Sequence, residues 1–335
     1  MNKIIRTLGA VLIIGVIAAG CDSVVDNTTE DLLPEDMNNS ITSLAEDANN
    51  CVPTGVGTLT ANYVNEVPDG PFDVTCDAGI FFDEDATING AALNGVTANS
   101  QPAQYGIVIR GADVDISNST VVVEADYPGE FISVAYLNGT GTISRSDISG
   151  AHRVGLLVRG EASDVTARGN TITGTGAKTS GWAENGVQVD NGAVITFRNN
   201  EVADHWWDGE SNWASNAIAL RANNSSITNN TFTDNESNIS ITGNDNSFKA
   251  NRTSSDVVSE SSFEFVAWGV FVQGSNNDIT GNQLTATDGG AGIYIFPDTE
   301  SEENKLTGNR ISGFEWPIFD GGDDTMEKGN PSVFN

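Results

Sequence analysis

A short pattern that recurs nine times constrains the fold of this chain more than any other feature. In each copy, an apolar residue is followed three positions later by a small residue and two positions after that by a second apolar residue, which Thr253 replaces in one copy. The small residues, which lie 21 to 31 positions apart, are Ala91, Ser119, Ser146, Asn170, Asn200, Asn230, Asn251, Asn282 and Asn309. A period of this length is typical of solenoids, in which successive units stack on one another. The repeat determines the architecture, but by itself it assigns no function.

A second pattern, in phase with the first, predicts one short strand in each coil. A small residue precedes an apolar–x–apolar triplet, as at 106–109 and 186–189, and one coil uses 131–134 instead. Because apolar residues alternate with a period of two residues, one face of each strand points inward. Asn, Gly, Asp and Ser fill the intervals between strands, and these residues accept turn geometry. No helical stripe of useful length follows residue 50.

The repeat resembles that of the right-handed parallel β-helix proteins, the pectate-lyase-like and NosD-like superfamily. The resemblance rests on pieces such as 227–232 (Ile-Thr-Asn-Asn-Thr-Phe) and 279–284 (Ile-Thr-Gly-Asn-Gln-Leu), and it covers residues 77–320. It implies an all-β chain, a single-stranded right-handed parallel β-helix (solenoid) of about nine to ten coils. Leucine-rich repeats are the main alternative, but their Leu-x-x-Leu-x-Leu framework is absent. Equivalent residues would stack about 4.8 Å apart, and the Asn side chains would form a structural hydrogen-bonded column.

The N-terminus predicts export and lipid anchoring. A basic start precedes an apolar run over residues 8–19, which is too short for a membrane span and is typical of a signal peptide. The sequence Ala-Ala-Gly-Cys at 18–21 resembles the lipobox of bacterial lipoproteins, although that family prefers Leu where Ala18 stands. The resemblance implies lipidation of Cys21, and ordinary signal cleavage beside a chance cysteine is the alternative. We therefore predict an exported protein, lipid-anchored to a membrane at the periplasmic face or the cell surface.

Three segments follow from these features. Residues 1–20 form the signal peptide, 21–50 an acidic disordered tether, and 51–335 the β-helix domain with an N-terminal cap at 51–76. In an oxidising compartment we expect Cys51 and Cys76 to form a disulfide that staples the cap, with two buried thiols as the alternative. No CxxC or His-rich spacing indicates zinc or redox chemistry.

The charge balance limits the partners. The formal net charge is −31, from 46 acidic and 15 basic residues. This excess argues against nucleic acid and anionic membrane surfaces, so we expect membrane contact through the lipid anchor only. The acidic excess has two possible explanations. It adapts the surface to high salt, as in halophilic proteins, or it supplies cation sites, for example for calcium. The excess is spread through tether and loops, which favours salt adaptation. The sequence assigns no metal site and no cofactor, and we expect a monomer.

The coils differ mainly in the segment between the second apolar residue of the pattern and the next strand. This segment is short at 233–237 and long at 173–185, 203–216 and 254–268, and all six tryptophans fall in segments of this type. Because Trp is normally used for packing or recognition, we predict a carbohydrate groove with walls at 203–216 and 254–268 and a floor at 233–237. Its ligand-binding residues would be Trp182, Trp206, Trp207, Trp213, Trp268, Phe271 and Tyr294. The alternative is that the tryptophans cover the solenoid wall.

Side chains that could catalyse a lyase reaction are scarce. A polysaccharide lyase needs a base beside the uronate carboxylate and a cation that neutralises this carboxylate. His205 or Lys178 would be the base, and Arg221 would be the neutralising cation. The other histidine, His152, lies in a short connector and is assigned to structure.

A glycoside hydrolase needs two carboxylates at a set separation, and Asp208, Glu210 and Glu264 are available for this role. None of these residues belongs to a catalytic motif of the β-helix lyases, pectin hydrolases or alginate epimerases. Arg159, Asp190 and Arg221 would form a ladder across three coils, for which surface ion pairing is the favoured interpretation.

Two functions follow, and the sequence does not decide whether the chain is an enzyme. The first is a lipid-anchored extracytoplasmic β-helix that binds polysaccharide through its Trp-rich loops and, if an enzyme, cleaves it as a lyase or glycoside hydrolase. The second is a non-catalytic surface or scaffold protein, adhesin-like, in which the solenoid is a rigid spacer. The two histidines and the missing motifs favour the second, whereas the gathering of tryptophans favours the first.

Overall fold

The repeat folds into a solenoid of stacked coils. The computed structural model describes residues 52–55, 72–75, 80–82, 85–90, 92–96, 103–123, 130–150, 153–178, 183–208, 214–255, 268–287, 290–297 and 301–333. The predicted signal peptide, Cys21, the tether, Cys51 and Cys76 lie outside these ranges. Within them, no helix is long and apolar enough to span a membrane.

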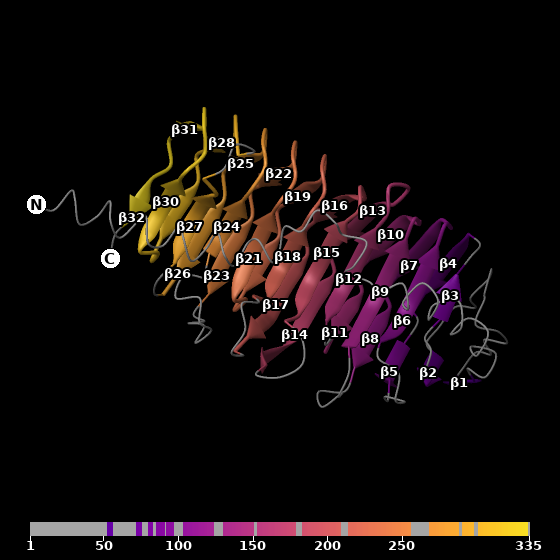
Figure 1. The fold of residues 1–335 in the computed structure, drawn as a ribbon. Helices are drawn as coiled ribbons and strands as arrows, with labels where there is room; N and C mark the ends of the chain where they lie inside the picture. The colour runs from indigo at the N-terminus through magenta and orange to yellow at the C-terminus, as the bar shows by residue number, and fades with distance from the viewer. Residues whose placement is uncertain are drawn as a thin grey trace, which may run out of the picture.

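Three sheets form the walls of the solenoid (Figure 1). Sheet A contains β1 (Val52–Gly55), β2 (Phe72–Thr75), β5 (Ala92–Val96), β8 (Thr120–Val123), β11 (Asp147–Ser149), β14 (Thr171–Lys178), β17 (Glu201–Trp207), β20 (Thr231–Thr233), β23 (Arg252–Ser255), β26 (Gln283–Ala286), β29 (Arg310–Ser312) and β32 (Ser332–Val333). Sheet B contains β3 (Ile80–Phe82), β6 (Ala103–Arg110), β9 (Glu130–Leu137), β12 (Val154–Arg159), β15 (Asn185–Asp190), β18 (Asn216–Leu220), β21 (Ser237–Ile241), β24 (Trp268–Val272), β27 (Ala291–Ile295) and β30 (Trp316–Asp320). Sheet C contains β4 (Ala86–Asn89), β7 (Val114–Ser117), β10 (Thr140–Ser144), β13 (Asp164–Arg168), β16 (Val194–Arg198), β19 (Ser226–Thr228), β22 (Ser247–Lys249), β25 (Asp278–Thr280), β28 (Lys305–Thr307) and β31 (Met326–Lys328).

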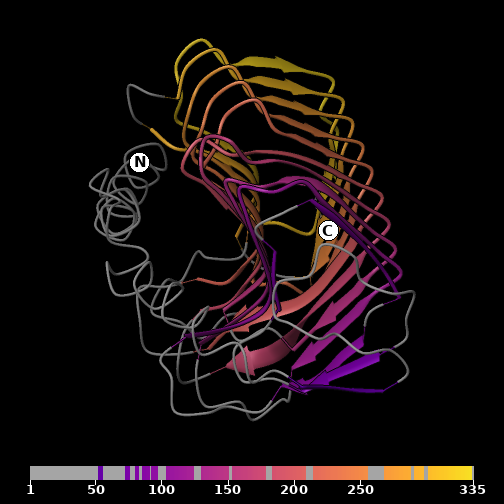
Figure 2. The ribbon, with the colours of Figure 1, turned by 90° about the vertical axis from the view of Figure 1, so that its right-hand side faces the viewer.

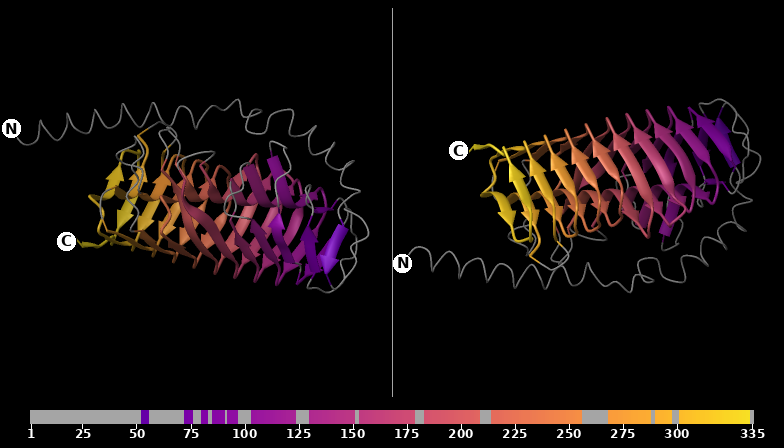
Figure 3. Two further views of the ribbon diagram at one scale, coloured as in Figure 1. Left: turned by 90° about the horizontal axis from the view of Figure 1, so that it is seen from below. Right: turned by 90° about the horizontal axis from the view of Figure 1, so that it is seen from above.

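Each coil passes through sheets B, C and A in turn, and all described strand pairs are parallel except β1 with β2. Seen more nearly along the stack, successive coils superpose in one outline (Figure 2), and two further views show them in chain order from end to end (Figure 3). The predicted all-β parallel β-helix is therefore confirmed.

The two apolar positions of the repeat lie in different sheets. The first position forms a column in sheet C, where Ile143, Ala167, Phe197, Ile227 and Phe248 pair in sequence. The second forms a column in sheet A, as when Ile172 pairs with Val202 and Val202 with Phe232. All of these side chains are buried in one continuous core, together with the inward residues of sheet B. The register predicted from the repeat is confirmed.

The small residues of the repeat form the predicted amide column between sheets C and A. From Asn170 onward, each Nδ2 donates to the Oδ1 of the equivalent Asn one coil later, with N···O distances of 2.9 to 3.2 Å. Each also donates to a carbonyl of the preceding coil, as Asn200 does to Ala167 at 3.0 Å. The column ends at Asn330, one coil beyond the last copy that the pattern identified. These residues are scaffold, because their polar groups are used within the column.

One strand lies two residues from its predicted register. The pattern placed 131–134 opposite 106–109, but Ile107 pairs with Val134 and Ile109 with Tyr136. A shift of two residues preserves the alternation of the strand, so alternation alone could not detect it. The native register buries the Tyr136 ring in the core, where its hydroxyl donates to the Val114 carbonyl at 3.0 Å.

Candidate functional site

The longer interruptions of the repeat all connect sheet A to sheet B, as between β14 and β15, β17 and β18, and β23 and β24. Trp206 and Trp207 were predicted in a loop but belong to strand β17, and Trp268 is the first residue of β24. Trp182 and Trp213 lie outside the described residues.

Strands β14 and β17 extend beyond their neighbours in sheet A. After a bulge between Thr173 and Gly176, the pairing continues as far as Lys178 opposite Trp207. The bulge makes room for a carboxylate, because a Cβ at Gly174 would overlap Oε1 of Glu184 and the carbonyl of Asp204. This extension explains why the predicted loop wall begins as a strand.

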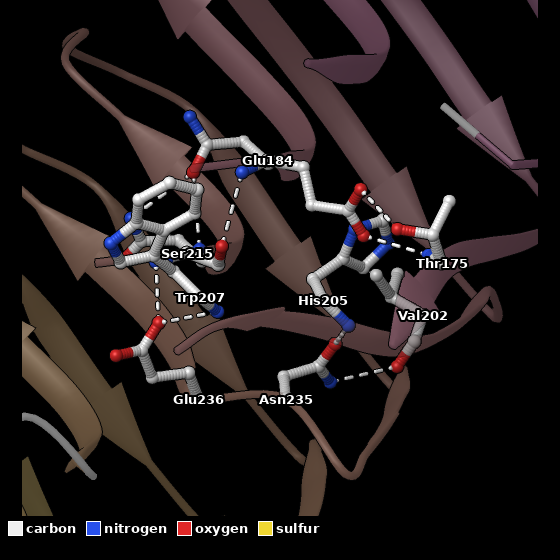
Figure 4. Close-up of polar contacts among 10 residues, drawn as sticks. Thr175, Glu184, Val202, His205, Trp207, Ser215, Asn235 and Glu236 are labelled. Atoms are coloured by element: carbon white, nitrogen blue, oxygen red, sulfur yellow. Dashed lines mark hydrogen bonds and ion pairs between the residues drawn. The ribbon is translucent and has the colours of Figure 1, made fainter. Parts of the chain in front are cut away.

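Glu184 and His205 form a buried pair behind this bulge (Figure 4). The Glu184 carboxylate accepts hydrogen bonds from the backbone N–H of Thr175 at 2.8 Å and from its hydroxyl at 3.0 Å. Nδ1 of His205 lies 3.4 Å from Oε1 of Glu184, and both side chains are 0% exposed. The pair therefore joins the bulge of β14, the residue before β15 and strand β17.

A second buried carboxylate lies one coil further on. Oε2 of Glu236 accepts from the backbone N–H groups of Trp207 (3.0 Å) and Ser215 (2.7 Å), and Oγ of Ser215 accepts from the N–H of Glu184 at 3.0 Å. We call Glu184, His205, Ser215 and Glu236 the buried polar cluster (Figure 4). Because one oxygen holds both sides of the β17–β18 connection, Glu236 fixes its base.

The second half of the predicted groove floor is part of this cluster and is closed. Asn235, Glu236 and Ser237 are 0 to 1% exposed, so a ligand on the surface does not reach them, whereas Thr233 and Asp234 at the start of the connector are half-buried. The physical reason is that the connector supplies hydrogen-bond partners to its neighbours, since Asn235 Oδ1 also accepts from the N–H of His205 at 3.2 Å.

The predicted catalytic residues are only partly described by the structure. His205 is enclosed, and neither ring nitrogen has a hydrogen-bond partner, with Nε2 against Gly186. Asp208 is half-buried after the end of β17, whereas Glu210 and Glu264 lie outside the described residues. Proton abstraction from a bound sugar requires contact with the base, which this position of His205 does not provide. Its catalytic role stays a prediction.

An acidic group lies close to the buried pair. Burial raises the pKa of the Asp204 carboxyl, and repulsion from Asp234 on the next coil raises it further, while His205 lowers it and Glu184 raises it. Within the described part of the chain, no three His, Cys, Asp or Glu side chains are grouped so as to hold a metal ion.

The outward face of sheet B carries a hydrogen-bonded row of amides. The Nδ2 group of Asn216 donates to Oδ1 of Asn185 at 3.1 Å, and Nδ2 of Asn185 donates to Oε1 of Gln188 at 3.3 Å. Nε2 of Gln188 in turn donates to Oδ2 of Asp190 at 2.8 Å. We call Asn185, Gln188 and Asn216 the amide row. It orients Asp190 along the sheet surface.

Arg159 and Arg221 lie close to Asp190, and Arg153 lies close to Arg221. Nε of Arg159 lies 3.4 Å from Oδ1 of Asp190, and Arg221 follows β18 on the next coil. Burial lowers the pKa of the Arg221 guanidinium, Asp190 raises it, and the neighbouring Arg153 and Arg159 lower it again. We call Arg153, Arg159, Asp190 and Arg221 the arginine cluster. It holds three positive charges and one negative charge in a chain whose net charge is −31.

The aromatic candidates form a stack on the same face of sheet B. The ring of Tyr294 is stacked on that of Phe271, with centroids 5.7 Å apart and planes 9° apart, and on that of Phe319, with centroids 4.9 Å apart and planes 10° apart. The ring centroids of Trp268 and Phe271 are 5.1 Å apart. Phe271 and Tyr294 are 3% and 5% exposed. Because neighbouring rings occupy their faces, this stack packs the sheet surface, and the sugar stacking predicted for Phe271 and Tyr294 has no free ring face to use.

Sequence reasoning identified part of these clusters. The ladder of Arg159, Asp190 and Arg221 was predicted from the strand register, and of its two contacts the structure shows the Arg159–Asp190 pair, while no ion pair joins Asp190 to Arg221 within the described residues. Glu184 and Glu236 were missed because a lone Glu in a connector carries no periodic signal. Their one sequence signal is a position directly before a small residue that opens a sheet B strand.

Comparison with known proteins agrees with this architecture. Residues 54–217 and 173–325 match the family described as right handed beta helix region. The chain belongs to this β-helix family. No curated protein matches the chain significantly.

Two solved structures illustrate the likeness of this β-helix protein to others. A double mutant of the periplasmic alginate epimerase AlgG is 15% identical with a TM-score of 0.52, over 77% of this chain and 68% of the epimerase. An alginate lyase from Paenibacillus sp. str. FPU-7 is 14% identical with a TM-score of 0.44, over 88% and 97% of the two chains. The first likeness shows a shared fold, and neither assigns a reaction.

Proposed function

We propose that this protein binds an anionic polysaccharide, of the polyuronate type, on the outward face of sheet B. The observation that carries the proposal is Arg221. Its half-buried guanidinium has no ion-pair partner within 4 Å among the described residues, and it lies beside two further arginines. A ligand carboxylate would offset this charge through charge-assisted hydrogen bonds, for which the planar guanidinium is well shaped.

A polymer fits the setting of the arginine cluster better than a small anion. The amide row offers donors and acceptors suited to sugar hydroxyls, and it lies next to the arginines across successive strands. Strands in a sheet lie about 4.8 Å apart, so a chain with repeated carboxylates would meet polar groups on several coils. The AlgG epimerase of the same fold is named for alginate, which makes alginate one member of a test panel.

The test compares Arg221→Gln with Arg310→Gln, an exposed arginine on sheet A, in calorimetric titrations with uronate and neutral oligosaccharides. We expect Arg221→Gln to weaken uronate binding by about tenfold, since hydrogen bonds to charged groups contribute about 1.5–3 kcal/mol. Neutral sugars should bind neither protein. Absence of binding to every uronate, or equal losses in both variants, would contradict the proposal.

Catalytic activity on the bound polymer is tested separately from binding. A lyase would generate an unsaturated, ultraviolet-absorbing product from the same polymer, and a hydrolase would release new reducing ends. The enclosure of His205 favours the second candidate function, a non-catalytic binding or scaffold protein. Binding without product would support this candidate, whereas product lost in Asp208→Asn would support an enzyme.

We also propose export and lipid anchoring through Cys21, on the strength of the signal segment and the lipobox-like residues. Mass spectrometry of the N-terminal peptide from the native host checks this, with a diacylglyceryl adduct on Cys21 as the expected result. An unmodified mature N-terminus would contradict it.

A further inference from the structure

The last described coil departs from the apolar pattern at two inward positions of the repeat. In sheet C, Glu327 of β31 pairs with Leu306, which is fully buried and belongs to the column of core residues. In sheet B, Asp320 of β30 pairs with the fully buried Ile295. Two carboxylates therefore occupy register positions that hold apolar core residues in the preceding coils.

The strands of this coil form one end of the solenoid. Among the described strands, β30, β31 and β32 are each hydrogen-bonded to a single neighbour, and they lie together at one end of the stack (Figure 1). An open strand edge presents unpaired N–H and C=O groups, which are a template for pairing with another chain. Inward-pointing charged residues are one of the devices by which natural sheets block such pairing.

The same coil also carries apolar groups that a partner would cover. Ile318, which pairs with Ile293 at the third inward position, is partly buried against the core. Met326 is 61% exposed and is the one exposed large hydrophobic residue in the described part of the chain. With apolar residues at 320 and 327, this end would be an open strand edge over an apolar core, so the two carboxylates determine its character.

The two carboxylates are close enough to repel each other and remain in contact with solvent. Oδ1 of Asp320 accepts hydrogen bonds from the backbone N–H of Gly322 and from the Thr325 hydroxyl, both at 3.1 Å. Burial raises the pKa of the Glu327 carboxyl, and repulsion from Asp320 raises it further. Both residues are exposed, so water solvates their charges. A chain stacked on this coil would remove that water, and burial of charges without a partner is costly.

We infer that Asp320 and Glu327 keep the protein monomeric by preventing this end of the solenoid from docking onto the same end of a second copy. A second copy is the partner that fits, because an identical end supplies matching strand edges and a twofold contact between like surfaces closes. In the native protein, this contact would bring two carboxylates from each copy together without water. Terminal repeats of solenoids need a polar outer face, which these two residues supply. The inference does not depend on the proposed function.

The experiment measures the mass of the full-length protein in a mild detergent near neutral pH by sedimentation velocity. We expect the wild type to be monomeric and Glu327→Leu, which extends the apolar column of sheet C, to reach about twice this mass as protein concentration rises. Glu327→Lys keeps a charge at the same position and should stay monomeric. The matched control is Glu201→Leu, at an exposed position of β17 away from the ends of the stack, which makes the same substitution and should also stay monomeric.

The possible outcomes either support the inference or overturn it. A folded Glu327→Leu protein that stays monomeric, or equal association of Glu201→Leu, would overturn it, and so would a dimeric wild type. Assemblies that grow beyond the dimer would overturn the contact between like ends, since a head-to-tail contact does not close. If Glu327→Leu fails to fold, the double variant Asp320→Asn/Glu327→Gln removes both charges and leaves an acceptor for the turn at 320. The double variant should show the same rise in mass, and a monomeric double variant would contradict the inference.

Discussion

At the residue scale, the turn between sheets C and A requires left-handed backbone in every coil. Asn199 and Asn229 have φ of 56° and 59° there, and Gly281 has 67°. Asn and Gly accept this region readily, since Gly has no Cβ and the short Asn side chain can hydrogen-bond locally. Ala250 occupies the same column with φ of 54° and has neither advantage. Together with Arg145 (φ 49°), it is therefore one of two strained positions among the residues that directly precede the small residues of the repeat.

Ala250→Gly should stabilise the protein by about 1 kcal/mol, because left-handed backbone costs a residue with a Cβ roughly 1–2 kcal/mol. The matched control is Gly281→Ala on the adjacent coil, where an added Cβ would meet no atom within 4 Å and only backbone strain is introduced. The Gly281→Ala variant should lose about 1 kcal/mol of unfolding free energy. The midpoints of urea unfolding measure both effects, provided that the dependence of unfolding free energy on urea concentration has the same slope in each variant. Midpoints of the two variants that shift in the same direction would refute the strain argument.

Residue-level reasoning from the sequence succeeded where a residue repeats and failed where it stands alone. The amide column was predictable because Asn230, Asn251 and Asn282 recur at one position of the repeat. Glu184 and Glu236 were not predictable, since whether a connector Glu is buried depends on donors such as Thr175 and Ser215 that the fold brings to it. His205 was predicted to be a catalytic base, and its enclosure depends on the extension of β17, which the repeat does not indicate.

At the element scale, the antiparallel pair at the N-terminal end bears on the two cysteines outside the described residues. Val52 of β1 pairs with Thr75 of β2, and Pro53 with Val74. Cys51 precedes Val52 in the sequence and Cys76 follows Thr75. One further step in the same register would make the cysteines cross-strand neighbours, at a separation that suits a disulfide.

We predict that Cys51 and Cys76 are linked in the exported protein. A non-reduced proteolytic digest should contain the linked peptides, which separate on reduction, and Cys51→Ser should leave Cys76 reactive toward maleimide. Loss of the link should lower the free energy of unfolding by about 3 kcal/mol, as expected for a loop of this length. Two maleimide-reactive cysteines in the native exported protein would contradict the prediction.

The elements also show the limit of pattern reading. Strand register was predictable in sheets A and C because inward residues alternate with turn residues at fixed offsets. It failed by two residues in β9, where Ile132 and Val134 are equally apolar and the next coil does not discriminate between them. The extension of β14 and β17 was missed because the bulge at 174–175 breaks the alternation on which the prediction depended.

At the scale of the whole molecule, two kinds of charge have different roles. The net charge of −31 belongs to the chain as a whole, and mutual repulsion of this size opposes compaction. The arginine cluster is a local exception, in which three arginines lie near one another and one of them, Arg159, pairs with Asp190. Dissolved salt screens both kinds of interaction over about 8–10 Å at moderate ionic strength, so it should act on stability and on ligand binding in opposite directions.

Raising NaCl from 0.05 to about 1 M should therefore raise the thermal midpoint while weakening uronate binding, because repulsion within the chain and attraction to the ligand are screened together. Calorimetry and binding titrations on the same samples measure the pair of effects. At equal ionic strength, CaCl₂ and MgCl₂ should stabilise the protein equally if the acidic excess serves salt adaptation. A midpoint that rises selectively with micromolar calcium would contradict that explanation and favour dedicated calcium sites, since site binding stabilises by mass action at low concentration whereas screening does not.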